Sequence, residues 1–296
     1  MADLHDLTDR DLIAEIQRRF DEKAASIKEM EFMTKKLLEL NERTKEAEAI
    51  KSQFLSLIKN EFNNPISSLL NLASLLALKK HPERFDEIAN MLNMELLRLD
   101  FQLKNIFAAT EIEAGEIAND YSRIKFTSIY EEVISGFRYL IADKRLTVNL
   151  AKCEDEGFIG DANKLYLILL NLISNACEFS YPDSKVSVAL KKETAGYLIT
   201  VEDAGEGIGV EFANEVYNRF TKFSSGKTRA HAGLGLGLSV VRGLVESLDG
   251  DVTFESQEGY TIFKVTLPAV SAEVAESASE GGNEFMFEDF GDAVEM

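Results

Sequence analysis

The stretch Asn171-Leu-Ile-Ser-Asn175-Ala-Cys-Glu-Phe-Ser180 belongs to a run of apolar residues with helical spacing. We expect a helix from about Asp161, a residue type that commonly caps helix N-termini. Asn171 and Asn175 then lie one turn apart on the same face. Their side-chain oxygens could hold a magnesium ion together with phosphate groups, because magnesium takes few protein ligands. Alone, two asparagines at this spacing are more often surface or capping residues.

A second motif, Glu202-Asp203-Ala-Gly205-Glu-Gly207-Ile-Gly209, follows an apolar run that predicts a strand. The carboxylate of Asp203 can accept a hydrogen bond from an exocyclic amine, which would select adenine. The glycines allow the backbone to come close to a flat ring. The alternative is a turn aspartate that bonds its own backbone.

Two further motifs follow, Arg219-Phe220-Thr-Lys222-Phe223 and Gly233-Leu-Gly235-Leu-Gly237-Leu-Ser239. The first pairs aromatic with basic residues. The alternative is an ordinary helix end with two core phenylalanines, which would give the same sequence pattern. The second opens a helix expected over 236–248. Glycines there leave backbone N–H groups free at the positive helix end, which suits phosphate. A lone glycine repeat is weak evidence.

The rest of residues 119–268 indicates a layer of helices on a sheet. Alternating apolar residues predict strands at Val148–Leu150, at Val186–Leu190, at 198–201, at Val252–Glu255 and at Tyr260–Leu267. With the helices before it, the chain is expected to be α+β.

Apolar residues at helical spacing run from Ile50 through Pro65 to Leu76, and a second such helix is expected from about Glu83 to Gly115. The apolar face of the second helix is wide enough to bury more than one partner. We therefore expect two hairpins to form a four-helix bundle in a homodimer.

Residues 9–50 read as a polar helix with apolar residues seven apart, such as Ile13, Phe20 and Ile27. This spacing favours a coiled coil, with a single amphipathic helix as the alternative. At the other end, residues 269–296 hold eight acids and no base. A disordered tail is expected there, or a short docking motif around Phe285 and Phe290.

Composition limits the possible partners and compartment. The net charge of -19 argues against nucleic acid binding. No apolar run approaches the roughly 18 residues that a membrane span needs. The two cysteines, Cys153 and Cys177, form no metal or disulfide pattern, which fits the cytoplasm.

Taken in order, the four motifs resemble the N, G1, F and G2 boxes of the ATPase domain shared by histidine kinases, gyrase, heat-shock ATPase chaperones and mismatch-repair ATPases. The helices in front make histidine kinases the nearest family, and the resemblance covers residues 50–268. The resemblance implies that the chain binds ATP with Mg2+. Asn171 and Asn175 would contact the phosphates and the magnesium ion, and Asp203 would hydrogen-bond adenine. Residues 219–236 would form a mobile lid. The remaining implied nucleotide contacts are Gly205, Gly207, Phe220, Lys222, Gly233, Gly235 and Gly237.

The stretch Lys51-Ser-Gln-Phe-Leu-Ser-Leu-Ile-Lys-Asn60-Glu61-Phe-Asn-Asn64-Pro65 resembles the phosphoacceptor box of the same family, in which a histidine stands where this chain has Asn60. An imidazole nitrogen can attack a phosphoryl group, whereas the amide nitrogen of Asn60 has its lone pair delocalised into the carbonyl. Asn63 and Glu178 also depart from the family pattern, in which both positions are usually basic.

These features predict an ATP-binding, histidine-kinase-like signalling protein that does not phosphorylate itself at position 60. Its partner would be a response-regulator receiver domain or another histidine kinase. Three alternatives stay open: a receiver phosphatase in which Asn64 orients water, a kinase for serine with Glu61 as general base, or a true kinase carrying an Asn60 mutation. The expected domains are residues 1–50, 51–118, 119–268 and 269–296.

Overall fold

The computed structural model describes residues 61–78, 84–213, 215–221 and 234–278, together with scattered positions between Arg18 and Lys59. The chain divides into two compact units, residues 1–60 and 61–296. In the first unit every described residue is helical. Its described apolar side chains are exposed, namely Met30, Met33, Leu37 and Leu38. A coiled coil over this segment stays a prediction.

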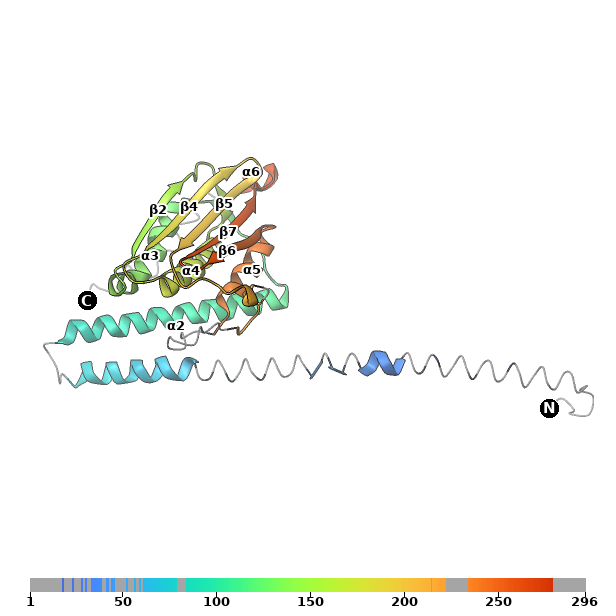
Figure 1. Ribbon diagram of the computed structural model, residues 1–296, viewed down its shortest axis with the longest axis horizontal. Coiled ribbons are helices and arrows are strands. Elements are labelled where there is room, and N and C mark those ends of the chain that lie inside the picture. The colour runs from blue at the N-terminus through green and yellow to red at the C-terminus, as the bar shows by residue number, and fades with distance from the viewer. Residues whose placement is uncertain are drawn as a thin grey trace, which may run out of the picture. The chain divides into compact units, whose positions relative to one another are not determined.

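The second unit is built on a mixed five-stranded sheet in the order β2-β4-β5-β7-β6 (Figure 1). The strands are β2 (Thr147–Cys153), β4 (Lys185–Glu193), β5 (Gly196–Asp203), β6 (Asp251–Gln257) and β7 (Tyr260–Pro268). β2 runs parallel to β4, and all other neighbours are antiparallel. All five strands predicted from apolar alternation are therefore present. A separate two-stranded sheet pairs β1 (Tyr121–Arg123) with β3 (Ile159–Asp161).

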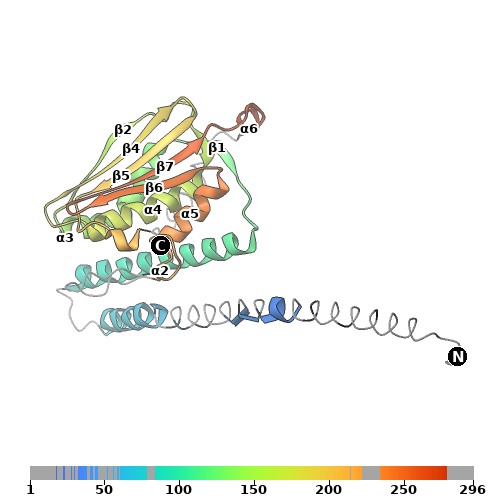
Figure 2. The ribbon, with the colours of Figure 1, turned by 45° about the vertical axis from the view of Figure 1, so that its right-hand side comes forward.

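Alternation along the strands explains which face of the sheet is buried. In β4, Val186, Val188 and Leu190 are fully buried. In β5, Ile199 and Val201 point to the same core. This face is covered by three helices (Figure 2), α3 (Phe126–Asp143), α4 (Ala162–Phe179) and α5 (Gly237–Ser247). The arrangement confirms the expected α+β class, although α3 was not predicted from the sequence.

Helix α4 is the central helix of this layer and packs against both α3 and α5. Five of its side chains lose all exposure, Leu165, Ile168, Leu169, Ile173 and Cys177. It begins where predicted, because the side chain of Asp161 accepts a hydrogen bond from the backbone N–H of Lys164 at 3.0 Å. The cap satisfies one of the free N–H groups of the first turn.

Two helices lie in the segment predicted to form a hairpin. Residues 61–77 are helical, and α2 spans Phe85–Ala114. Gly115 ends α2 in the left-handed conformation with φ 68°, as is common at helix C-termini. α2 packs against α5. Among the described residues no helix is long and apolar enough to cross a membrane. A four-helix bundle in a dimer stays a prediction.

Two short helices complete the second unit. A 3-10 helix, η2, spans Val210–Phe212, and α6 spans Ala272–Ser277. The side chain of Ser271 caps α6 by accepting from the N–H of Val274 at 3.4 Å. The segment 269–296, predicted as a disordered tail, therefore begins with an ordered helical turn. The aromatic residues of that segment, 285–290, lie outside the described residues.

The burial of the helix layer gives a test of the fold. Phe126 and Tyr139 both lie on α3, the first fully buried and the second 60% exposed. Replacing Phe126 with alanine should lower the free energy of unfolding by about 3–5 kcal/mol, because it leaves a cavity in the core. The free energy of unfolding of Tyr139→Ala should stay within about 0.5 kcal/mol of that of the native chain. Urea denaturation measures both, and equal losses would contradict this core.

Candidate nucleotide-binding site

Helix α4 carries the two asparagines of the first motif, and the structure gives them different surroundings. Asn171 is only 2% exposed. Its Nδ2 donates to Oδ1 of Asn105 on α2 at 2.8 Å and to the carbonyl oxygen of Leu167 at 2.9 Å. Asn175 is half-buried, and its side chain makes no hydrogen bond within the described part of the chain. Of the pair, Asn175 is thus the one whose amide is available to a ligand.

Asp203 lies at the end of β5 and is buried, with 6% exposure. Burial raises the pKa of this carboxyl from 3.8 to about 7, although the N–H of Gly205 donates to it and opposes the shift. A buried carboxyl with a strongly raised pKa is a candidate functional group. A ligand amine that donates to Asp203 would supply the partner that the ionised form needs in this apolar site.

Gly205 is required where the chain leaves Asp203. A Cβ on Gly205 would lie 2.4 Å from the carbonyl oxygen of Phe179 and 2.9 Å from Oδ1 of Asp203. Ser180 forms an isolated β-bridge with Gly205. The end of α4 and the glycine motif therefore meet beside the buried carboxyl.

The next glycines are anchored to the turn between β6 and β7. Gly207 has φ 78°, and a Cβ there would meet the carbonyl oxygen of Gln257 at 2.5 Å. The N–H of Ile208 donates to Oγ of Ser256 at 2.8 Å. Gly259 donates its N–H to the carbonyl oxygen of Gly205 at 2.9 Å. These bonds fix the loop that follows Asp203.

Two buried hydroxyl groups near Asp203 were not singled out from the sequence. Ser180 is 3% exposed, and its Oγ has no hydrogen-bond partner. Thr261 is 4% exposed and lies opposite Asp203 in the pairing of β5 with β7. Thr261 shares a hydrogen bond of 2.8 Å with Ser256. An unpartnered buried hydroxyl at such a site fits a ligand that completes its hydrogen bonding.

The predicted lid segment is described only at its two ends. Phe220 has φ 64°, and its N–H donates to the carbonyl oxygen of Gly235 at 2.8 Å. Gly235 has φ 67° and has room for no side chain there. Lys222 and Gly233, both predicted contacts, lie outside the described residues.

Gly237 begins α5 directly beside Asn171. A Cβ on Gly237 would lie 2.6 Å from Oδ1 of Asn171, so only glycine lets the helix start so close. The N-terminus of α5 and the amide of Asn171 therefore meet. A helix N-terminus favours phosphate.

α2 contacts this region through several side chains. Besides the bond from Asn171 to Asn105, Arg219 pairs with Glu113 at 3.1 Å. The absence of a side chain at Gly243 on α5 lets Ile112 pack onto the helix backbone, since a Cβ there would lie within 3.1 Å of three Ile112 atoms. Nothing in the sequence motifs indicated these contacts, because they join distant segments.

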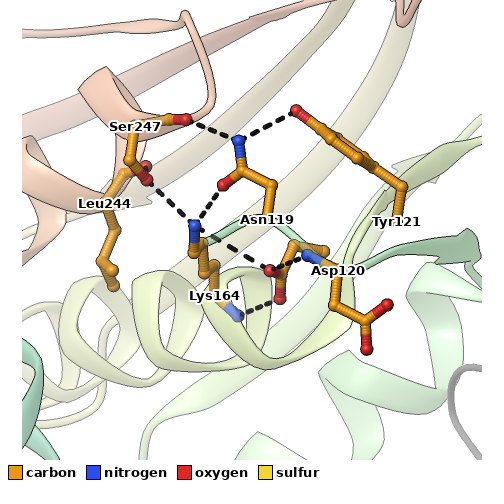
Figure 3. Close-up of polar contacts among 7 residues, drawn as sticks. Asn119, Asp120, Tyr121, Lys164, Leu244 and Ser247 are labelled. Carbon is orange, nitrogen blue, oxygen red and sulfur yellow. Dashed lines mark hydrogen bonds and ion pairs between the residues drawn. The ribbon is translucent and has the colours of Figure 1, made fainter. Parts of the chain in front are cut away.

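A second polar cluster, around Lys164, anchors the segment that follows α2 (Figure 3). Lys164 is 8% exposed, and its Nζ donates to Oδ1 of Asn119 and to Oγ of Ser247, the latter at 3.3 Å. Asn119 in turn donates to the carbonyl oxygen of Ser247 at 2.8 Å. Asp161 accepts from the N–H of Asp120 at 3.0 Å and lies 3.9 Å from the ammonium of Lys164. Desolvation lowers the pKa of Lys164, although Asp161 and Glu111 oppose this.

Two of the predicted catalytic positions, Glu61 and Asn64, lie on the first helix of the second unit. Glu61 is half-buried and Asn64 is exposed. Asn60 lies outside the described residues. In the described part of the chain, no three His, Cys, Asp or Glu side chains gather as metal ligands. The residues that fit a nucleotide therefore cluster around α4, β5 and α5, and the acceptor-like positions lie elsewhere in the chain.

Comparison with known proteins identifies the class of this domain. Residues 160–271 match the family of histidine kinase-, DNA gyrase B- and HSP90-like ATPases. The chain is 28% identical over 262 residues to hybrid signal transduction histidine kinase D of Dictyostelium discoideum, covering 85% of this chain and 17% of that protein. It is 26% identical over 223 residues to the sensor-like histidine kinase SenX3 of Mycolicibacterium smegmatis, covering 75% of this chain and 58% of that one.

Solved structures agree on the fold. The histidine kinase AdeS of Acinetobacter baumannii superposes with a TM-score of 0.52 at 20% identity, covering 71% of this chain and 98% of that one. Residues 160–271 therefore form an ATPase domain of the histidine kinase type, as the motifs predict, and binding of ATP to this chain stays a prediction. The chain spans from 17% to 58% of the length of the two relatives.

The raised pKa of Asp203 predicts a distinctive pH dependence. The folded chain binds more protons at this carboxyl than the unfolded chain between pH 3.8 and about 7. Its contribution to stability is therefore complete below about pH 4 and is lost as the pH rises to the folded pKa. Relative to Asp203→Asn, the native chain should lose up to about 1.4 kcal/mol per pH unit in this window. Urea denaturation from pH 4 to 8 measures the difference, and parallel curves would exclude a buried, protonated Asp203.

Proposed function

We propose that this chain is an ATP-binding, histidine-kinase-like signalling protein whose acceptor site is degenerate. The observation that carries the proposal is the buried carboxyl of Asp203 beside the close-packed Gly205, which is bridged by Ser180 with its unpartnered hydroxyl. This combination suits the edge of a purine base, because a base offers both an amine donor and ring-nitrogen acceptors. It lies in a domain that matches ATPases.

The phosphate end of the nucleotide would lie at the N-terminus of α5. Gly235 lets the backbone at Phe220 come close there, Gly237 lets the amide of Asn171 come close, and the helix end attracts negative charge. Asn175, with no side-chain hydrogen bond in the described region, would be the protein ligand of Mg2+. One amide oxygen is consistent with magnesium, which takes most of its ligands from phosphate and water. Bound ATP would supply the γ-phosphoryl group.

The acceptor position is where this chain departs from a self-phosphorylating kinase. Asn60 has an amide in place of an imidazole. It therefore lacks the ring nitrogen that would accept the phosphoryl group. ATP would then act by favouring one conformation of the chain, which requires unequal affinity for two states. The proposed partner that recognises this conformation is a receiver domain or another histidine kinase.

A homodimer is part of the proposal. Apolar side chains on residues 61–78 and on α2 are exposed in the single chain, which is costly for a monomer. The most exposed are Leu70, Leu78, Phe85, Met91 and Phe107, all at least 48% exposed. A second copy covering these helices would bury them in a four-helix bundle.

Labelling with ATP tests the proposal. The native chain should bind ATP with magnesium, yet stay unlabelled by γ-labelled ATP, because Asn60 cannot accept the phosphoryl group. Asn60→His should become labelled with an acid-labile, base-stable phosphate. The control is Asn60→His combined with Asp203→Asn, which should bind ATP at least roughly tenfold more weakly. Label on the native chain would contradict the degenerate acceptor, and a serine phosphate would favour the serine-kinase alternative.

A second candidate function is dephosphorylation of a receiver domain. Asn64 is exposed on its helix, immediately before the buried Pro65, so its amide can reach a partner. An amide can orient water for in-line attack on phosphorus. Its neighbour Asn63 is also exposed.

The two asparagines provide a matched pair of variants. If the chain is a phosphatase, it should speed release of phosphate from a receiver domain charged by a small phosphodonor. Asn64→Ala should slow that release by roughly tenfold or more, because the water loses its orienting group. Asn63→Ala should leave the rate within a factor of about two. An equal effect of both changes, or no acceleration by the native chain, would exclude this activity.

A further inference from the structure

The C-terminal end of α4 lacks the usual devices that end a helix. Its cap residue, Ser180, has extended backbone with φ -58° and ψ 144°, and no basic residue lies in its last turn. The final carbonyl groups of a helix have no partner inside the helix, and they carry its negative dipole end. Their partners must come from elsewhere in the fold.

Lys144, in the turn between α3 and β2, supplies the hydrogen-bond donors for these last carbonyl groups of α4. Its Nζ donates to the carbonyl oxygens of Cys177 and Ser180, each at 3.1 Å, and to that of Glu178. One ammonium therefore satisfies three carbonyl groups at the end of α4. The carbonyl oxygen of Lys144 also accepts from the N–H of Asp183 at 2.9 Å, so the residue fixes the chain on both sides of Ser180.

The segment that Lys144 holds forms one side of the proposed adenine site. Ser180 bridges Gly205, and the N–H of Tyr181 donates to the carbonyl oxygen of Ala204 at 3.0 Å. The carbonyl oxygen of Phe179 is the group that a side chain at Gly205 would strike. A displacement at the end of α4 would therefore displace the backbone beside Asp203.

Cys177 lies inside this arrangement. Its side chain is fully buried, and burial raises the pKa of the thiol to about 12. The charge of Lys144 opposes that shift, and the charge of Asp203 reinforces it, so the thiol lies within the field of both groups.

We propose that Lys144 is a positioning residue for the adenine end of the nucleotide site, acting by capping α4 so that Ser180 and Gly205 stay in place beside Asp203. The inference rests on the proposed nucleotide site. Lys144 itself does not contact the nucleotide. It orders the backbone that does.

Ligand binding by two Lys144 variants tests the inference. Lys144→Met keeps the length of the side chain and removes the charge and its donors. This variant should lower the affinities for ATP, ADP and adenosine by the same factor, roughly tenfold, because the base end is common to all three. Lys144→Arg keeps the hydrogen-bond donors and the charge, so its three affinities should stay within about threefold of those of the native chain. Lys185→Met, an exposed lysine on β4, is the charge-matched control and should leave all three affinities unchanged.

Thiol labelling gives a readout independent of nucleotide. In a Cys153→Ser background, Cys177 should react with a thiol reagent at least roughly tenfold faster in Lys144→Met than in Lys185→Met, because the uncapped turn opens. Thermal unfolding of each variant identifies any that fails to fold, and Lys144→Arg then carries the comparison.

The outcomes separate the two proposals. If the native chain binds ATP but Lys144→Met binds all three ligands normally, the positioning role is wrong and the nucleotide site stands. A loss confined to ATP and ADP would place Lys144 at the phosphate end and would also overturn the inference. If the native chain binds no nucleotide, the proposed function fails, and the positioning role fails with it.

Discussion

Helix α4 is buried along almost its whole length, so the polar groups that it carries must find partners on other elements. Asp161 caps its first turn, Lys144 its last, and Asn105 of α2 holds the amide of Asn171 in the middle. Each of these partners comes from a different segment of the chain. The sheet supplies the apolar surface under α4, and the polar groups around it determine where the surrounding segments lie.

The same arrangement ties α2 to the proposed nucleotide site. Asn171 uses its two N–H donors on Asn105 and on Leu167, which leaves only its oxygen near the start of α5. A movement of α2 would free or occupy the amide of a residue that the sequence assigns to phosphate binding. The exposed pair of Arg219 and Glu113 adds little energy of its own, since exposed ion pairs contribute about 0–1 kcal/mol. Ile112 packs onto the backbone at Gly243 in the same contact.

Local signals account for what could be predicted from the sequence. The strands follow from apolar alternation, and the starts of α4 and α5 follow from Asp161 and from the glycines before Leu236. Asp203 was found because a carboxylate at a strand end beside glycines can accept from an adenine amine, and because its motif resembles the G1 box of the family. The roles of Lys144, Asn105 and Thr261 could not be predicted, because each depends on a partner far away in the sequence. Helix α3 was missed, although its apolar face is buried against α4.

The cluster around Lys164 limits how far the ATPase domain can travel. Asn119 is anchored to Ser247 only four residues beyond Gly115, the end of α2. An extended chain of four residues spans roughly 14 Å, which sets the reach of the domain while this anchor holds. If the anchor and β1 were released, the free tether would extend to Phe126, eleven residues away, and its reach would grow to roughly 38 Å. A buried lysine in a folded domain thereby sets the length of an interdomain tether.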